Sequence, residues 1–143
     1  MVVDKLMQHG LEDRIKVIAS GKLITPADVA WAICAGADFV TSARGFMFSI
    51  GCIQSLKCNK NTCPTGVATH NKRLQKGLNP TDKAIKVRNY VEKMKESIEV
   101  IAHSCGVDEM RGLNRTHVRI VQNNGTSIPM DELCPVGEKY ESI

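Results

Sequence analysis

The fold of this chain is decided by residues 15–45, IKVIASGKLITPADVAWAICAGADFVTSARG. The stretch opens with a short apolar, β-branched run at residues 15–20, which Gly21 interrupts and which is typical of a buried parallel strand. A helical pattern follows and stops at Gly36, after which residues 38–42 have the composition of a second strand. A strand, a crossover helix and a second strand form a βαβ unit, so the predicted fold class is α/β.

The crossover helix has a clear start signal. Thr25 can cap the helix, Pro26 suits its first position and Asp28 lies three residues after the cap. Beyond the second strand, a short helix is expected over residues 46–53, so that its last turn carries Cys52 into the segment that follows.

That segment, residues 52–70, reads CIQSLKCNKNTCPTGVATH and contains three of the six cysteines. The thiolates of Cys52, Cys58 and Cys63 are soft ligands that suit an iron–sulfur cluster or zinc. A structural zinc site normally has four protein ligands and two close Cys-x-x-Cys pairs, which this loop lacks, although His70 is available as a fourth donor. The spacing alone leaves three interpretations open: a cluster, a zinc ion, or plain buried thiols.

Both strands of the βαβ unit end in a turn that contains a glycine and a basic residue, Gly21 with Lys22 and Gly45 with Arg44. In (β/α)8 barrels, the loops after the last two strands often bind phosphate, because bare amides and the dipole of a short helix favour an anion. Gly21 would let the backbone approach such an anion, and the basic residues would add charge. The alternative is that the two glycines only form tight turns.

The longest predicted helix covers residues 79–105, where apolar residues recur at alternating steps of three and four. One stripe of this helix is therefore expected to be buried, with Cys105 at its end, and Cys34 is likewise expected to be a core thiol. Residues 117–121 followed by residues 123–125, NNG, predict a strand that enters a hairpin.

Composition limits the possible functions. A chain of 143 residues with 43% hydrophobic and 24% charged residues fits one soluble domain. The net charge of +4 is spread along the chain, and three Phe, two Tyr and one Trp offer little stacking surface, so no nucleic-acid binding is expected. No apolar run approaches the roughly 20 residues of a membrane span, and no signal peptide is evident. We expect a cytoplasmic protein that does not bind membranes, in which cysteines are thiols or metal ligands.

The sequence resembles a known family at the IASGK motif of residues 18–22, at GAD in residues 36–38 and above all at the cysteine loop, residues 51–69. These motifs look like the end of the FMN-binding synthase domain of glutamate synthase, and the resemblance runs from about residue 10 to 105. It implies the C-terminal part of a (β/α)8 TIM-type flavin barrel, about its last two βα units, with a cysteine-rich loop and a long C-terminal helix. The expected parts are barrel units at residues 1–53, the cluster loop at 52–70, the helix at 79–105 and a hairpin or tail at 115–143.

The resemblance also assigns site residues. The family's three cluster cysteines fall on Cys52, Cys58 and Cys63, which would hold a [3Fe-4S] cluster beside FMN. Its first phosphate-binding turn falls on Ser20, Gly21 and Lys22, and its second on Ser42, Ala43 and Arg44. No catalytic residue is assigned.

In that family, 2-oxoglutarate and glutamine-derived ammonia form 2-iminoglutarate, which reduced FMN converts to glutamate, while the cluster passes in electrons. The sequence does not identify the electron donor. Residues 19–21, Ala-Ser-Gly, stand where the larger members tend to have Asp-Gly-Gly, which favours the shorter branch without a fused glutaminase domain.

Two barrel strands are predicted where eight are needed, so we expect this chain alone not to catalyse the reaction of such an oxidoreductase. The missing barrel part would come from the rest of the protein or from a partner chain, and a truncation, a split subunit and an excised fragment all remain open. The alternative function is a small non-catalytic zinc- or metal-binding partner module.

Overall fold

The computed structural model describes residues 2–135, which form a mixed α/β structure with one long helix and, in this part, no closed barrel. Its helices are α1 (Val2–Gln8), α2 (Pro26–Cys34), α3 (Ala43–Ser49), α4 (Lys72–Gln75), α5 (Pro80–Ser104) and α6 (Met130–Leu133), with 3-10 turns η1 (Cys58–Lys60), η2 (Met110–Gly112) and η3 (Arg115–His117). Its strands are β1 (Ile18–Ser20), β2 (Phe39–Thr41), β3 (Arg119–Val121) and β4 (Ser127–Pro129). The α/β class and the long helix are confirmed, whereas the eight-stranded barrel stays a prediction.

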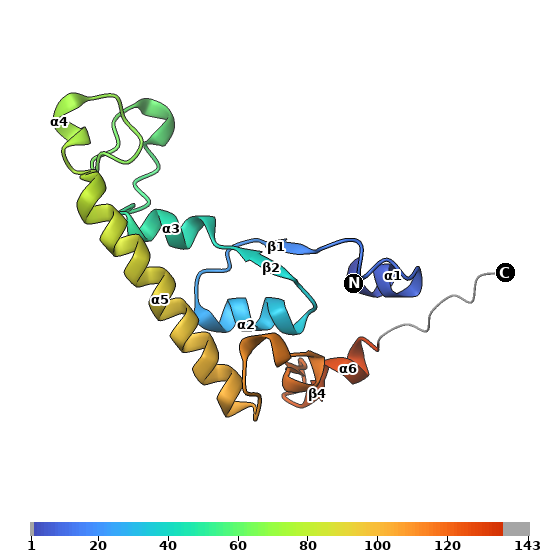
Figure 1. Cartoon of the computed structure of the whole chain (residues 1–143). Coiled ribbons are helices and arrows are strands. Elements are labelled where there is room, and N and C mark those ends of the chain that lie inside the picture. Colours follow the sequence, from blue (N-terminus) through green and yellow to red (C-terminus); the bar gives the residue numbers. More distant parts are fainter. Residues whose placement is uncertain (1, 136–143) are drawn as a thin grey trace.

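The βαβ unit is present as predicted. Strands β1 and β2 pair in parallel, with Ile18 opposite Phe39, and α2 forms the crossover between them (Figure 1). At the start of α2 the hydroxyl of Thr25 accepts a hydrogen bond from the amide of Asp28 at 3.2 Å, and the Asp28 carboxylate accepts one from the Thr25 amide at 2.9 Å. This reciprocal capping box fixes where the crossover begins, and Gly36, at φ +101°, ends it.

The expectation of a buried first strand is wrong for this chain. Ile18 is 62% exposed, and its partner Phe39 on β2 is 54% exposed. Trp31 on the crossover helix is 48% exposed as well. The reason is that burial of a strand depends on its neighbours: this sheet has only two strands, and no other element within residues 2–135 covers these side chains.

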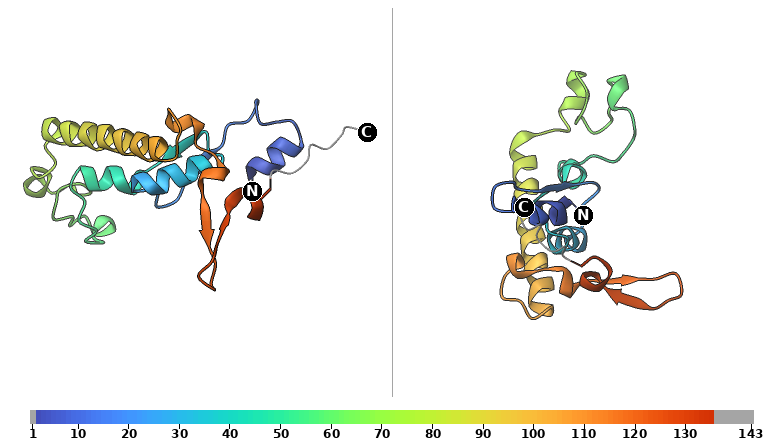
Figure 2. Two further views of the ribbon diagram at one scale, coloured as in Figure 1. Left: turned by 90° about the horizontal axis from the view of Figure 1, so that it is seen from below. Right: turned by 90° about the vertical axis from the view of Figure 1, so that its right-hand side faces the viewer.

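The core lies between α2 and α5, which pack against each other at an angle (Figure 1; Figure 2 gives two further views). Ile98 and Ala102 on α5 are 3% and 0% exposed and pack against the buried face of α2, including Cys34. Cys105 is exposed, contrary to expectation, because it is the C-cap of α5 and the chain reverses at Gly106. Although α5 has 25 residues, neither it nor another helix in the described part is apolar enough to span a bilayer.

The chain beyond α5 returns to the N-terminal segment. Strands β3 and β4 form the predicted hairpin, which extends away from the helices (Figure 2). Its turn contains Gly125 at φ +82°. The buried guanidinium of Arg115 on η3 pairs with the carboxylate of Asp4 on α1 and donates to the carbonyl of Cys134 at 2.8 Å. The last part of the expected tail, residues 136–143, lies outside the described residues.

Candidate functional site

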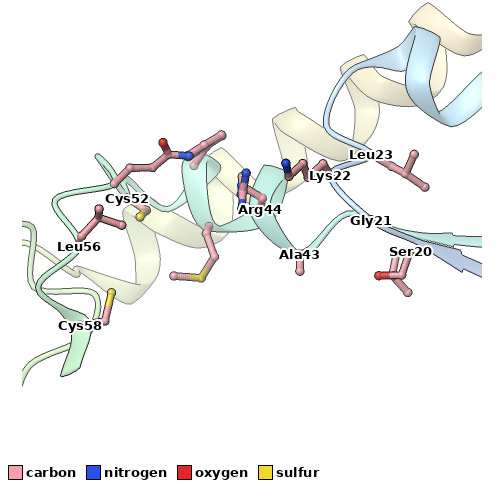
Figure 3. Close-up of a pocket in the computed structure, with 13 residues that line it drawn as sticks. Ser20, Gly21, Lys22, Leu23, Ala43, Arg44, Cys52, Leu56 and Cys58 are labelled. Atoms are coloured by element: carbon pink, nitrogen blue, oxygen red, sulfur yellow. The ribbon is translucent and has the colours of Figure 1, made fainter.

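A cavity of about 480 Å³ lies where the ends of β1 and β2, the helix α3 and the cysteine loop meet (Figure 3). Its lining includes five of the six residues expected to bind phosphate and two of the three expected cluster ligands: Ser20, Gly21, Lys22, Ala43, Arg44, Cys52 and Cys58. In Figure 3 the residues of the strand-end turns lie toward one end of this cavity and the two cysteines toward the other. The fold therefore brings both predicted sites, far apart in sequence, around one opening.

The turn after β1 has an unusual backbone. Gly21 takes φ +135°, and no atom lies within 4 Å of where a Cβ would stand, so the backbone angle rather than crowding explains the glycine. Lys22 takes φ +59°, a conformation that residues other than glycine adopt rarely and that clusters at ligand-binding sites. Both residues are exposed and line the cavity.

The turn after β2 is divided between two sides. Ala43 and Arg44 line the cavity, whereas Ser42 does not. The Ser42 hydroxyl donates instead to the carbonyl of Leu23 and lies 3.0 Å from the hydroxyl oxygen of Tyr90 on α5. The side chain of Ser42 therefore holds the turn in place through contacts outside the cavity.

Cys52 lies just beyond α3 and not on it. The helix covers Ala43–Ser49 rather than the expected residues 46–53, because Gly51 adopts φ +100° and reverses the chain. The amide of Cys52 then donates to the carbonyl of Met47 at 3.0 Å, which closes a Schellman motif at the helix end. Since these backbone bonds fix its position, Cys52 is held at the cavity wall.

Cys63 is buried, at 5% exposure, in a turn whose donors converge on its sulfur. The Thr65 hydroxyl lies 3.4 Å from Sγ, and the backbone amides of Ala68, Thr65 and Val67 also donate to it. The Thr65 hydroxyl and then these amides stabilise the thiolate and lower the pKa of Cys63 to about 7. A substantial fraction of this side chain is therefore a thiolate at neutral pH, the form that binds metals.

The chain around Cys63 is held by close backbone packing. A Cβ on Gly66 would lie 2.2 Å from the carbonyl oxygen of Leu74, so only glycine fits against the end of α4. Asn61, at φ +56°, accepts from the amide of His70 at 2.5 Å through its side chain and from the Thr69 hydroxyl at 2.7 Å through its carbonyl. The second half of the loop is therefore well supported.

The first half of the loop is not supported in this way. Gln54 and Leu56 take φ of +54° and +55°, which costs backbone energy in residues with a side chain. Leu56 is also 84% exposed and Ile53 65% exposed. The segment between Cys52 and Cys58 is therefore the part of the loop with most reason to adjust when a ligand binds.

The structure does not gather the three cysteines into one group. Cys52 and Cys58 line the main cavity, Cys58 also lines a second cavity with His70, and Cys63 is held in its own turn. No set of three or more His, Cys, Asp or Glu side chains in residues 2–135 lies close enough together to hold a metal ion. The donor chemistry fits an iron–sulfur cluster, because the loop offers three thiol side chains, of which Cys63 is surrounded by backbone amides that stabilise its thiolate.

Comparison with known proteins decides the family. A family profile described as the conserved region in glutamate synthase matches residues 1–108, which include every residue that lines the cavity. The chain belongs to the glutamate synthase family. It is 44% identical over 133 residues to the glutamate synthase large subunit-like protein YerD of Bacillus subtilis. The aligned region covers 92% of this chain and 25% of that protein.

This glutamate synthase family chain is also similar to the archaeal glutamate synthase (NADPH) of Methanocaldococcus jannaschii, with 31% identity over 139 residues, 96% of the chain and 27% of the relative. It is 41% identical to the glutamate synthase (NADPH) large chain of Bacillus subtilis over 71 residues, half of this chain and 5% of that protein. The chain spans about a quarter of the length of the first two relatives.

Two residues of the site were missed by the sequence analysis. Thr65 supports the thiolate of Cys63, and Tyr90 contacts the turn after β2. The sequence signal that could have pointed to Tyr90 is Gly45, because a glycine inside a helix often leaves room for a neighbouring side chain. The sequence pattern did not identify Tyr90 as that neighbour.

Proposed function

We propose that this chain is the C-terminal part of an FMN- and iron–sulfur-dependent glutamate synthase-like oxidoreductase, in which it holds the phosphate of FMN and a [3Fe-4S] cluster. The complete enzyme would reductively aminate 2-oxoglutarate with glutamine-derived ammonia through 2-iminoglutarate, and this chain alone would be inactive. The observation that supports the proposal most strongly is the single cavity lined by both strand-end turns, Cys52 and Cys58.

The phosphate half of the proposal rests on backbone and charge. Gly21 and Lys22 expose the turn after β1, Ala43 begins the helix after β2, and Lys22 and Arg44 bring two positive charges to the same cavity. These groups would bind and orient the phosphate of FMN, and the flavin, when bound, supplies hydride transfer.

The cluster half rests on the cysteine loop. Cys63 has a pKa lowered to about 7, Cys52 is fixed just beyond the end of α3, and Cys58 lies across the cavity from the phosphate turns. The cluster, when bound, supplies single-electron transfer. The amides around Cys63 would stabilise the negative charge on its sulfur. The segment between Cys52 and Cys58 would change conformation to bring both cysteines to the metal.

The exposed sheet supports an incomplete barrel. Ile18 and Phe39 on the two strands are apolar and more than half exposed, which is unusual for a parallel sheet, and Trp31 on α2 is about half exposed as well. The relatives are about four times as long as this chain. The missing strands, supplied by the rest of the protein or by a partner chain, would cover these side chains. The proposed location is the cytoplasm, where the six free cysteines stay reduced.

Metal content tests this proposal. The chain is purified without oxygen and reconstituted with iron and sulfide, and broad visible absorption with about three irons per chain is expected. Serine substitution of Cys52, Cys58 or Cys63 should lower the iron content, whereas Cys105→Ser and Cys134→Ser, outside the loop, should leave it unchanged. One zinc per chain and no iron would instead identify a small zinc-binding partner module.

A further inference from the structure

Tyr90 lies on α5, outside the cavity, yet it contacts Ser42 in the second proposed phosphate turn and Ile24 in the segment that follows the first. Its hydroxyl donates to the carbonyl of Ile24 at 3.1 Å, and its oxygen lies 3.0 Å from the hydroxyl of Ser42. Ser42 in turn donates to the carbonyl of Leu23. These contacts form a polar cluster of Tyr90, Ser42, Leu23 and Ile24 that joins segments 48 and 66 residues apart.

The residues of this cluster lie next to both phosphate turns in the chain. Leu23 and Ile24 follow Gly21 and Lys22 in the chain, and Ser42 precedes Ala43 and Arg44. Leu23 itself lines the cavity. A hydrogen bond that joins Ser42 to the stretch after β1 therefore fixes the spacing between the two turns.

The space for the Tyr90 hydroxyl is made by a glycine. Gly45 is buried within α3, and a Cβ at that position would lie 2.0 Å from Tyr90 Oη and 2.5 Å from Ser42 Oγ. Glycine inside a helix is unfavourable by roughly 1 kcal/mol relative to alanine. The ring of Tyr90 is further held by Phe46, with centroids 5.4 Å apart in an edge-to-face contact. Gly45 and Phe46 on α3 thus both pack closely against the side chain of Tyr90.

We propose that Tyr90 is a positioning residue of the phosphate site: its hydroxyl, bonded to Ile24 and in contact with Ser42, supports the Ser42–Leu23 bond that joins the turn after β1 to the turn after β2, so that one phosphate can contact both. This inference rests on the proposed function, because it assumes that the two turns share one anion. Preorganised groups bind more tightly, since no free energy is lost in ordering them when the ligand arrives.

Phosphate titration of the full chain tests this role. The chain is labelled with ¹⁵N and titrated with inorganic phosphate, and the amide signals of Gly21 and Ala43 are followed. In the unaltered chain both signals should follow one binding curve. Tyr90→Phe keeps the ring contact with Phe46 but removes the hydroxyl, so binding should weaken about tenfold, the equivalent of one lost hydrogen bond, and the two curves should separate.

The control is Ser104→Ala, which removes a hydroxyl that donates to the Val100 carbonyl at 2.8 Å on the same helix and should change neither curve. A lower melting temperature for Tyr90→Phe with unchanged, coincident curves would make Tyr90 merely structural and overturn the inference. If the unaltered chain shows no phosphate shifts, the proposed phosphate site itself fails. Should Tyr90→Phe not fold, Gly45→Ala, which displaces the hydroxyl but keeps the tyrosine, must separate the curves, and coincident curves there would overturn the inference.

Discussion

Gly45→Ala should destabilise this chain, although the same change stabilises most helices. At an ordinary helix position, replacing glycine by alanine gains about 1 kcal/mol because the unfolded chain loses freedom. Here the new methyl group would stand 2.0 Å from the hydroxyl oxygen of Tyr90 and 2.5 Å from that of Ser42. Both distances are far below van der Waals contact, so Tyr90 has to move.

The magnitude follows from what that movement breaks. The Tyr90 hydroxyl would lose the hydrogen bond that it donates to Ile24, worth about 1 kcal/mol, and displacing the packed ring costs about 1–3 kcal/mol more. Subtracting the helix gain of about 1 kcal/mol leaves a net loss of about 1–3 kcal/mol. The effect therefore has the opposite sign to helix propensity.

Urea unfolding followed by circular dichroism measures this loss. Gly45→Ala, Tyr90→Phe and the double variant are compared with the unaltered chain, and Asn89→Ala, at an exposed position of α5, serves as a control that should change stability by less than about 0.5 kcal/mol. In the double variant the shortest conflict, that with the Tyr90 hydroxyl, is gone while the one with Ser42 remains, so the combined loss should be smaller than the sum of the two separate losses. A stabilised Gly45→Ala chain, or strictly additive effects, would refute the Tyr90 contact.

Three other substitutions test the supports of the site. Gly66→Ala should disrupt the cysteine loop, because its methyl group would meet the Leu74 carbonyl at a residue that already has φ +80°; unchanged amide exchange around Cys63 would contradict this. Thr25→Ala should cost about 1 kcal/mol through loss of the α2 cap, and an unchanged urea midpoint would count against the capping box. Burial raises the pKa of Asp4, but hydrogen bonds and charges, including those of Arg115, outweigh it and hold the pKa below 3.8. The stability from this carboxylate is therefore present above pH 3.8 and lost as the pH falls through the lowered value, so Asp4→Asn should flatten the acid limb of a pH titration of stability, and an unaltered limb would exclude this cause.

Local signals allowed much of the fold to be predicted. Thr25 and Asp28 marked the start of α2 because a capping box involves only four neighbouring residues. The hairpin turn at Gly125 was predicted on the same basis. The short helix was placed too far along the chain, because Gly51 was not recognised as its end.

Long-range features were beyond the sequence pattern. Ile18 reads as a buried strand residue, yet its burial depends on neighbouring elements, and within residues 2–135 the sheet pairs β1 with β2 alone. The contact of Tyr90 with Ser42 joins positions 48 residues apart, which no periodicity reveals. The assignment of the cysteines as metal ligands remains a prediction. The hydrogen-bond donors around Cys63 come from the folded turn and could not be identified from the sequence.

X-ray absorption at the iron edge tests the cysteine cluster most directly. After reconstitution of the chain with iron and sulfide, sulfur neighbours around each iron and an additional iron–iron shell are expected, and both should vanish when Cys52, Cys58 and Cys63 are all replaced by serine. Isolated iron with nitrogen or oxygen neighbours, or a spectrum that the triple substitution leaves unchanged, would contradict a cluster held by this loop.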